Sequence, residues 1–242
     1  MKTSWKLILL GLFACSASAN PRAPETTSYT TLAKSHLLDF RFSFPTIAGS
    51  YPGLLAQLRA DQKMSYSSEL DQARDEAEYR AEEKFPFNTH EFWRDWTTTG
   101  QTTRLIGLQC RTDTFEGGAH PNHTSAWLLW DKKRNATIGL KDLFVAKNGF
   151  WPVLERSYCL ALKQERLRRS GTGSLCAGPN QLTIEFLDTN LDWSFDTVRI
   201  IADPYAAGTY AEGSYVVNLP MTANLIAAVK PEYRSSFEAQ RQ

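Results

Sequence analysis

The stretch Glu116-Gly-Gly-Ala-His-Pro-Asn-His123 decides how the middle of this chain folds and where a site is to be sought. It combines two glycines and a proline with carboxylate, amide and imidazole side chains, a composition typical of a shaped loop. Strand-like segments flank it, over residues 102–114 before it and 123–131 after it. The stretch therefore predicts a shaped loop between two strands, where sites are commonly built.

Outward from this loop, helix-like and strand-like segments mix without a regular strand–helix–strand repeat. The alternation of Leu38, Phe40, Phe42 and Phe44 predicts a half-buried strand, and Gly100-Gln101 indicates a hairpin. The region 52–84 is helical in character, and Ser67 or Ser68 is a candidate cap for a second helix within it. Further strands are expected at 92–99, 181–187, 198–202 and 213–220, and further helices at 151–169 and after a Thr222 cap. We therefore predict an α+β fold of antiparallel sheets with packed helices.

The composition allows a large core and excludes some partners. The chain has 242 residues, of which 42% are hydrophobic, and its formal net charge is +1. Such a chain folds as one or two domains. A nucleic-acid-binding protein is usually strongly basic, so we expect no nucleic acid among the partners.

The N-terminus has the pattern of a targeting segment. Lys2 and Lys6 precede a short apolar run over residues 7–13, which is too short to span a bilayer. Two processing routes stay open: cleavage after Ala19, or lipidation of Cys15 in a lipobox-like sequence that would supply an outer-membrane lipid anchor. We expect residues 1–19 to be a signal peptide and 20–34 a flexible leader. The protein is then located in the bacterial periplasm or outer membrane, with no transmembrane helix in the mature chain.

Export permits disulfides, and three further cysteines follow the leader. Cys159 is expected on a helix, and Cys176 lies just past a Gly/Ser turn that folds back toward it, so these two are the natural pair. Cys110 lies in an apolar strand, where a buried thiol is the expected role.

Two loops carry the candidate binding residues. In the first, Glu116, His120 and His123 are of ligand types that suit zinc, but Pro121 rules out the helix that a two-histidine zinc motif needs. The same loop is explained as a turn with a polar rim, and its binding candidates are Gly117, Gly118, His120, Asn122 and His123. The second loop offers Tyr205, Tyr210 and Glu212, since loop tyrosines stack on sugars or anchor interfaces. No nucleophile elbow, phosphate loop or dinucleotide motif occurs, so we expect no cofactor and no catalytic residues.

Several motifs in order resemble a bacterial envelope family that joins a PdaC-like domain, also called DUF4163, to a DUF3298 domain. They are 115–122, Trp130-Asp131, 140–144, 204–213 and 217–220. The resemblance implies two subdomains, at 35–125 and 126–235. It also implies a recognition module, because the catalytic metal domain of such deacetylases is a separate module and a similar domain of lysozyme-sensing anti-sigma factors binds lysozyme. One departure is Phe115-Glu116, where the family commonly has Tyr-Thr.

These observations favour a non-catalytic cell-envelope protein that binds peptidoglycan, another glycan or a lysozyme-like protein acting on the wall. The alternative is a metal-dependent hydrolase of cell-wall polysaccharide that uses the loop from Glu116 to His123.

Overall fold

A computed structural model describes residues 28–145, 149–170 and 176–240. The expected signal peptide, Cys15 and the first part of the expected leader therefore lie outside the described residues.

The larger part of the fold is a six-stranded sheet in sequential order. Its strands are β1 (Ser28–Lys34), β2 (Leu38–Pro45), β3 (His90–Gln101), β4 (Leu105–Phe115), β5 (Asn122–Asp131) and β6 (Ala136–Ile138). Neighbouring strands are antiparallel except β2 and β3, which run parallel. A parallel pair needs a crossover connection, and the helix α1 (Pro52–Glu83) supplies it. The predicted antiparallel α+β fold is confirmed, with this one strand–helix–strand unit as an exception.

The helix α1 is a single helix of 32 residues and not the two helices expected from Ser67 and Ser68. No glycine or proline follows its first turn, and pairs such as Arg80 and Glu76, 2.6 Å apart, support its exposed surface. The possible caps therefore stay inside an uninterrupted helix. Of its apolar residues, Leu54, Leu58 and Ala73 are buried, and its charged positions mostly face solvent.

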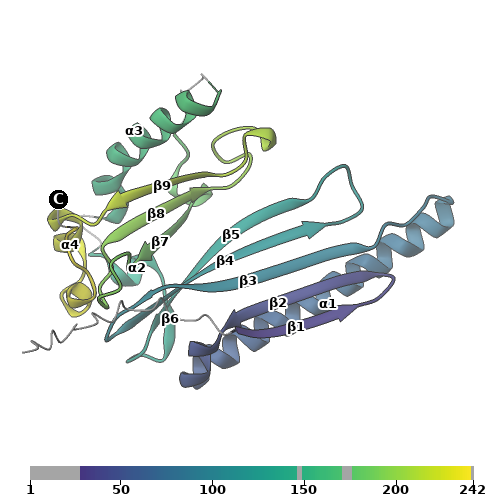
Figure 1. The fold of residues 1–242 in the computed structure, drawn as a ribbon, viewed down its shortest axis with the longest axis horizontal. Coiled ribbons are helices and arrows are strands. Elements are labelled where there is room, and N and C mark those ends of the chain that lie inside the picture. Colours follow the sequence, from purple (N-terminus) through teal and green to yellow (C-terminus); the bar gives the residue numbers. More distant parts are fainter. Residues whose placement is uncertain (1–27, 146–148, 171–175, 241–242) are drawn as a thin grey trace, which may run out of the picture.

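The second part is a three-stranded antiparallel sheet of β7 (Thr183–Leu187), β8 (Thr197–Ala202) and β9 (Tyr215–Pro220). It packs with α2 (Leu140–Leu143), α3 (Phe150–Ser170) and α4 (Ala223–Ala228), as Figure 1 shows. Thr222 caps α4 as predicted, because its hydroxyl accepts the backbone N–H of Leu225. Short 3₁₀ helices lie at Thr46–Ser50, Pro179–Gln181, Tyr210–Glu212 and Pro231–Ser236.

Both faces of the six-stranded sheet are covered near the second sheet (Figure 1). On one face Ile106 and Trp130 pack in the core beneath α1. On the other, Leu105 and Leu129 join the core that contains Phe186 of β7. Successive strand residues thus serve two cores, as the alternation of side chains requires. The subdomain boundary expected between residues 125 and 126 falls inside β5, because the β4–β5 pairing continues to Asp131.

Residues 28–34 are not part of a flexible leader, since they form the edge strand β1. Tyr29 pairs with Phe44 of β2, and their ring centres are 5.2 Å apart. The run of Tyr and Thr that suggested a linker has high β-propensity, and the apolar strand β2 offers it a partner. The pairing therefore overrides the polar composition.

The hairpin signal at Gly100 marks a bulge near the end of β3, and the turn itself lies at residues 102–104. The ladder shifts register between Thr98 and Gly100. A Cβ atom on Gly100 would lie 2.7 Å from the Cβ of Asp188, so close approach of the second sheet requires glycine here.

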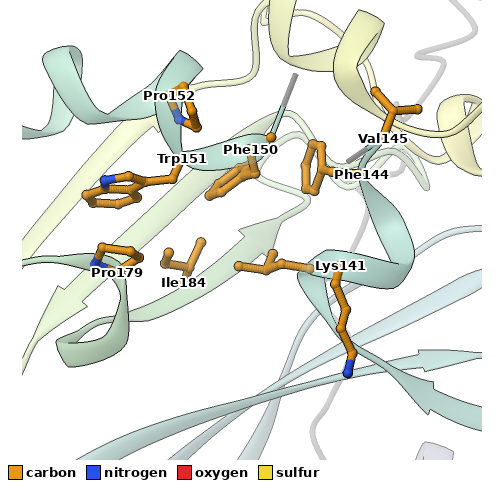
Figure 2. Close-up of a pocket in the computed structure, with 10 residues that line it drawn as sticks. Lys141, Phe144, Val145, Phe150, Trp151, Pro152, Pro179 and Ile184 are labelled. Carbon is orange, nitrogen blue, oxygen red and sulfur yellow. The ribbon is translucent and has the colours of Figure 1, made fainter. Parts of the chain in front are cut away.

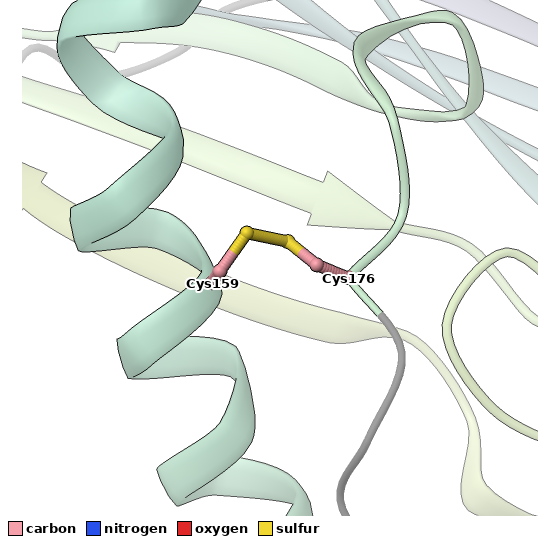
Figure 3. The surroundings of a disulfide bond; sticks show 2 residues. All are labelled: Cys159 and Cys176. Carbon is pink, nitrogen blue, oxygen red and sulfur yellow. A yellow bond between two sulfur atoms is a disulfide. The ribbon is translucent and has the colours of Figure 1, made fainter.

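The predicted pairing of Cys159 with Cys176 is present as a disulfide that ties α3 to the segment before β7 (Figure 3). Cys110 is buried in β4 as expected, and burial raises the pKa of its thiol to about 11. A thiol with that pKa is a poor nucleophile at neutral pH, which agrees with a packing role.

Candidate functional site

The two loops singled out in the sequence meet in space. The first is the β4–β5 turn, and the second connects β8 to β9. The imidazole of His120 stacks on the ring of Tyr210 with their centres 3.9 Å apart. The hydroxyl of Tyr210 also donates a hydrogen bond to the carbonyl of Pro121. The tertiary structure thus joins loops that are 89 residues apart along the chain into one surface.

Tyr205 extends this surface into a row of three rings, called here the aromatic row: His120, Tyr210 and Tyr205. The centres of the Tyr205 and Tyr210 rings are 6.0 Å apart. Tyr205 is 68% exposed, and its φ of 72° is a left-handed conformation that a bulky residue seldom adopts. Backbone strain of this kind clusters at functional sites. The row therefore presents an exposed ring on a constrained backbone.

A polar cavity of about 360 Å³ lies beside the aromatic row, at the tip of the β4–β5 hairpin. His120 belongs to both features, since its ring stacks on Tyr210 and also lines the cavity. Amide and hydroxyl groups can donate or accept hydrogen bonds there, and the carboxylate can accept them. The lining residues are Thr114, Glu116, Gly118, Ala119, His120 and Asn122.

The carboxylate of Asp203 holds the bases of both loops together. It accepts the backbone N–H of Ser125 at 2.6 Å, the Ser125 hydroxyl at 2.8 Å and the Ser214 hydroxyl at 3.3 Å. The Nε2 of His123 lies 3.1 Å from the Ser214 Oγ. The serine thus stands between the histidine and the aspartate, whereas a catalytic triad needs the aspartate on the histidine ring. The contacts that this cluster makes are those of a structural support.

Arg169 and Glu212 hold the second loop in place through hydrogen bonds. Arg169 at the end of α3 donates to the carbonyls of Glu212 at 3.2 Å and Ser214 at 2.8 Å. The Glu212 carboxylate accepts the hydroxyl of Tyr215 and the backbone N–H of Thr209. These hydrogen bonds, the one from Tyr215 first, lower the pKa of Glu212. Its carboxylate is therefore engaged in holding the loop.

The predicted binding residues separate into two groups. His120, Asn122 and Gly118 line the cavity, and Tyr205 and Tyr210 complete the aromatic row. By contrast, Gly117, His123 and Glu212 have structural contacts. Gly117 has a φ of 75°, and its carbonyl accepts a hydrogen bond from the Asn88 amide. Gly118 lies in open space, because a Cβ atom placed on it would meet no atom within 4 Å.

Sequence reasoning missed the supports of the site, namely Asp203, Ser214 and Arg169. Cations in the last turn of a helix are favoured by the helix dipole alone, so the sequence gives no reason to single out Arg169. Asp203 stands at the start of the second loop, but only the fold reveals that Ser125 lies opposite it. Their roles depend on contacts between distant segments.

A metal centre at the first loop is not formed. Across the residues that the structure describes, no three His, Cys, Asp or Glu side chains are grouped so that they could hold a metal ion. His120 instead stacks on Tyr210, with its Nδ1 2.9 Å from the Pro121 carbonyl, and His123 contacts Ser214. The arrangement thus does not supply the ligand set that the hydrolase hypothesis needs.

A second, apolar cavity of about 330 Å³ lies away from both loops, between α2, α3 and β7. Figure 2 shows Trp151 facing Pro179 on one side of it and Phe144 beside Phe150 on another, while Lys141 extends away. No predicted site residue lines this cavity.

The fold and the two-loop site define an α+β protein with two packed sheets, in which the described residues form no group of His, Cys, Asp and Glu that could hold a metal ion. Residues 32–123 match the sequence profile of a family described as deacetylase PdaC. A DUF3298 family protein from Bacteroides fragilis NCTC 9343 has a similar crystal structure, with a TM-score of 0.56 and 16% identity over 86% of this chain and 94% of that one. A DUF3298 family protein from Pseudomonas aeruginosa PAO1 gives a TM-score of 0.56 and 16% identity over 89% and 96%. Curated protein sequences yield no significant match.

Residues 32–123 are therefore similar to a PdaC-type domain, and the chain has the fold of DUF3298 family proteins, as its motifs predicted. Among the described helices, none is both long enough and apolar enough to cross a membrane.

Proposed function

We propose that this protein is a non-catalytic binding protein of the bacterial cell envelope that recognises glycan, with peptidoglycan as the leading candidate. The observation that carries the proposal is the aromatic row beside a polar cavity. Exposed rings offer flat apolar surfaces that suit the C–H faces of sugar rings, and the cavity supplies hydrogen-bonding groups for hydroxyl or acetamido substituents. Neither feature requires a metal ion or a nucleophile.

The proposed location is the periplasm or the outer membrane. It is supported by the charged and apolar pattern of residues 1–19 and by the disulfide, which suits an oxidising compartment. Intact-mass measurement of the protein from its native host separates the two routes: cleavage before Asn20 leaves an unmodified N-terminus, whereas lipidation of Cys15 adds acyl mass.

Replacement of Tyr205 by alanine is expected to weaken binding of soluble peptidoglycan fragments about tenfold, or ~1.4 kcal/mol, because a stacked ring is lost. The melting temperature should hardly change, since this side chain is 68% exposed. Isothermal titration calorimetry with fragments up to millimolar concentration measures the affinity of wild type and variant. Tyr79→Ala is the matched control, as Tyr79 is a 56% exposed tyrosine on α1.

Two results would remove the proposal. One is an absence of binding to peptidoglycan fragments and to chitin-type oligosaccharides at millimolar concentration. The other is binding that Tyr205→Ala and Tyr210→Ala leave unchanged. Capture of a lysozyme-like protein without any glycan binding would instead show that the aromatic row anchors a protein interface, the other partner expected from the sequence.

A further inference from the structure

The loop between β7 and β8 forms a cavity separate from the aromatic row. Its volume is about 410 Å³. Every side chain that lines it carries oxygen, and none of them is cationic. The lining residues are Thr189, Asn190, Asp192 and Asp196 of the loop, with Glu238 and Gln240 of the C-terminal segment. Hard oxygen ligands of this kind suit calcium or magnesium.

No ion pair within the described residues balances the negative charge of this cavity. Its carboxylates are those of Asp192, Asp196 and Glu238. Lys132 approaches the loop, with its Nζ 5.7 Å from the centre of the Trp193 ring, but it donates to the Thr102 carbonyl. Three carboxylates around one cavity therefore repel one another unless a cation joins them.

The buried carboxylate of Asp196 has one oxygen atom without a hydrogen-bond partner among the described residues. Its side chain is 2% exposed and lines the cavity. Oδ2 accepts the backbone N–H of Thr189 at 3.3 Å and the Thr189 hydroxyl at 2.6 Å. Oδ1 is buried and has no hydrogen-bond partner among the described residues. A buried carboxylate oxygen without a partner is costly, and coordination of a cation would satisfy it.

The loop shares the first part of the spacing of a calcium-binding loop, whereas its twelfth position, a bidentate Glu in those loops, is Arg199. Asp188, Asn190 and Asp192 occupy alternate positions, as the first three ligands of such loops do, and Asp196 stands at the ninth position. The sixth position, which is glycine in those loops because of a sharp turn, is Trp193 with a φ of 72°. The Asp188 carboxylate accepts the N–H groups of Asp192 and Trp193, each at 3.1 Å, which holds the loop in this curved form.

Glu238 brings the C-terminal segment to the loop. The Asn190 amide donates to Asp192 at 3.1 Å and to Glu238 at 2.6 Å, so one amide group bridges two carboxylates. The backbone N–H of Glu238 donates to the Phe195 carbonyl at 3.1 Å, which fixes the segment beside the loop. The carboxylates are not yet grouped as a preformed metal site. A cation would replace the bridging amide donors and draw Asp192, Asp196 and Glu238 inward.

We propose that this cavity binds a calcium ion through Asp192, Asp196, Glu238 and the Asn190 side-chain oxygen. Calcium is favoured over magnesium because it accepts irregular sets of oxygen ligands, whereas magnesium demands a near-ideal octahedron. Binding links the β7–β8 loop to the C-terminal segment and so stabilises the second sheet. This site is independent of glycan binding at the aromatic row.

The test is isothermal titration calorimetry of the full-length protein after chelator treatment, with CaCl₂ and separately MgCl₂. Titration to about 10 mM covers the affinities of extracellular calcium modules, roughly 10⁻⁴–10⁻³ M. We expect one bound Ca²⁺, a higher melting temperature in CaCl₂ and a weaker response to MgCl₂. Asp192→Asn and Glu238→Gln should each lower the Ca²⁺ affinity at least about tenfold, as expected when a charged ligand is lost. Glu82→Gln, at an exposed position of α1, is the control that should leave binding unchanged.

Terbium luminescence gives a second readout. Tb³⁺ takes calcium sites, and a nearby indole sensitises its emission, so the 54% exposed Trp193 should report binding. Trp193→Phe should remove the emission but retain the calorimetric Ca²⁺ signal. The proposal is overturned by the absence of heat and of a melting shift at 10 mM CaCl₂, by Ca²⁺ binding that both carboxylate variants leave intact, or by equal affinity for Mg²⁺.

Discussion

Asp131→Ala is expected to destabilise the protein by about 3–5 kcal/mol, the usual cost of breaking a buried ion pair from one side. The Asp131 carboxylate is fully buried at the end of β5. It accepts Arg104 at 2.9 Å and the Tyr233 hydroxyl at 2.9 Å. The Arg104 guanidinium also lies 4.1 Å from the centre of the Tyr233 ring. Truncation therefore leaves a partly buried cation and a buried hydroxyl without their acceptor.

Urea unfolding monitored by circular dichroism measures this effect. Asp71→Ala is the matched control, because the Asp71 side chain is 61% exposed and its pairing with Arg74 is worth less than about 1 kcal/mol. A loss below about 1 kcal/mol for Asp131→Ala would contradict the role assigned to this cluster. Burial by itself would raise the pKa of Asp131, but hydrogen bonds from Arg104, Arg134 and Tyr233 outweigh it and lower the pKa. The stabilisation that the Asp131 carboxylate provides is therefore present at neutral pH and is lost in acid as the carboxylate protonates.

Glu185 is expected to change the stability with pH in the opposite direction to Asp131. Its stabilising contribution is present near pH 5 and is lost as the pH rises to about 7. It lies on β7 and faces Arg199 of β8, and Arg199 also contacts Gln109 of the six-stranded sheet at 3.4 Å. Burial raises the pKa of Glu185 from 4.5 to about 7, although Arg199 opposes the shift. One carboxylate oxygen has no hydrogen-bond partner among the described residues.

The sign follows from proton binding. Between pH 4.5 and 7 the native Glu185 holds a proton that the unfolded chain releases, so the free energy of unfolding falls as pH rises and is level above that range. The raised pKa corresponds to about 3 kcal/mol. Glu185→Gln removes this titration, so its stability relative to wild type should improve as the pH rises from 5 to 8. Urea unfolding at both pH values measures the difference, with Glu78→Gln, at an exposed position, as the control.

A difference between wild type and Glu185→Gln that does not change with pH would show that Glu185 is ionised throughout. The residue lies where the two sheets meet, so a confirmed pH dependence would also identify their interface as the part that responds to pH.

The site could be predicted only in part. Some of its residues are recognisable from the local sequence, whereas others matter only through contacts with distant segments. Local chemistry is visible in the sequence: backbone requirements marked Gly117, and aromatic side chains marked Tyr205 and Tyr210. The supports are not local: Asp203 matters because Ser125 and Ser214 converge on it, and Arg169 because the loop from β8 to β9 passes beside the end of α3. Contacts between such distant partners leave no characteristic spacing in a single sequence.

The same distinction applies to the fold. By itself the sequence determined where most strands and helices form, the Thr222 cap, the pairing of Cys159 with Cys176 and the motifs of the family, because periodicity and turn chemistry act over a few residues. Only the tertiary structure decided that β1 is paired and that β2 lies parallel to β3. It also decided that α1 runs unbroken and that His120 stacks on Tyr210. These features depend on which distant segments pack together and remove their apolar surfaces from water. Such burial exists only in the folded chain.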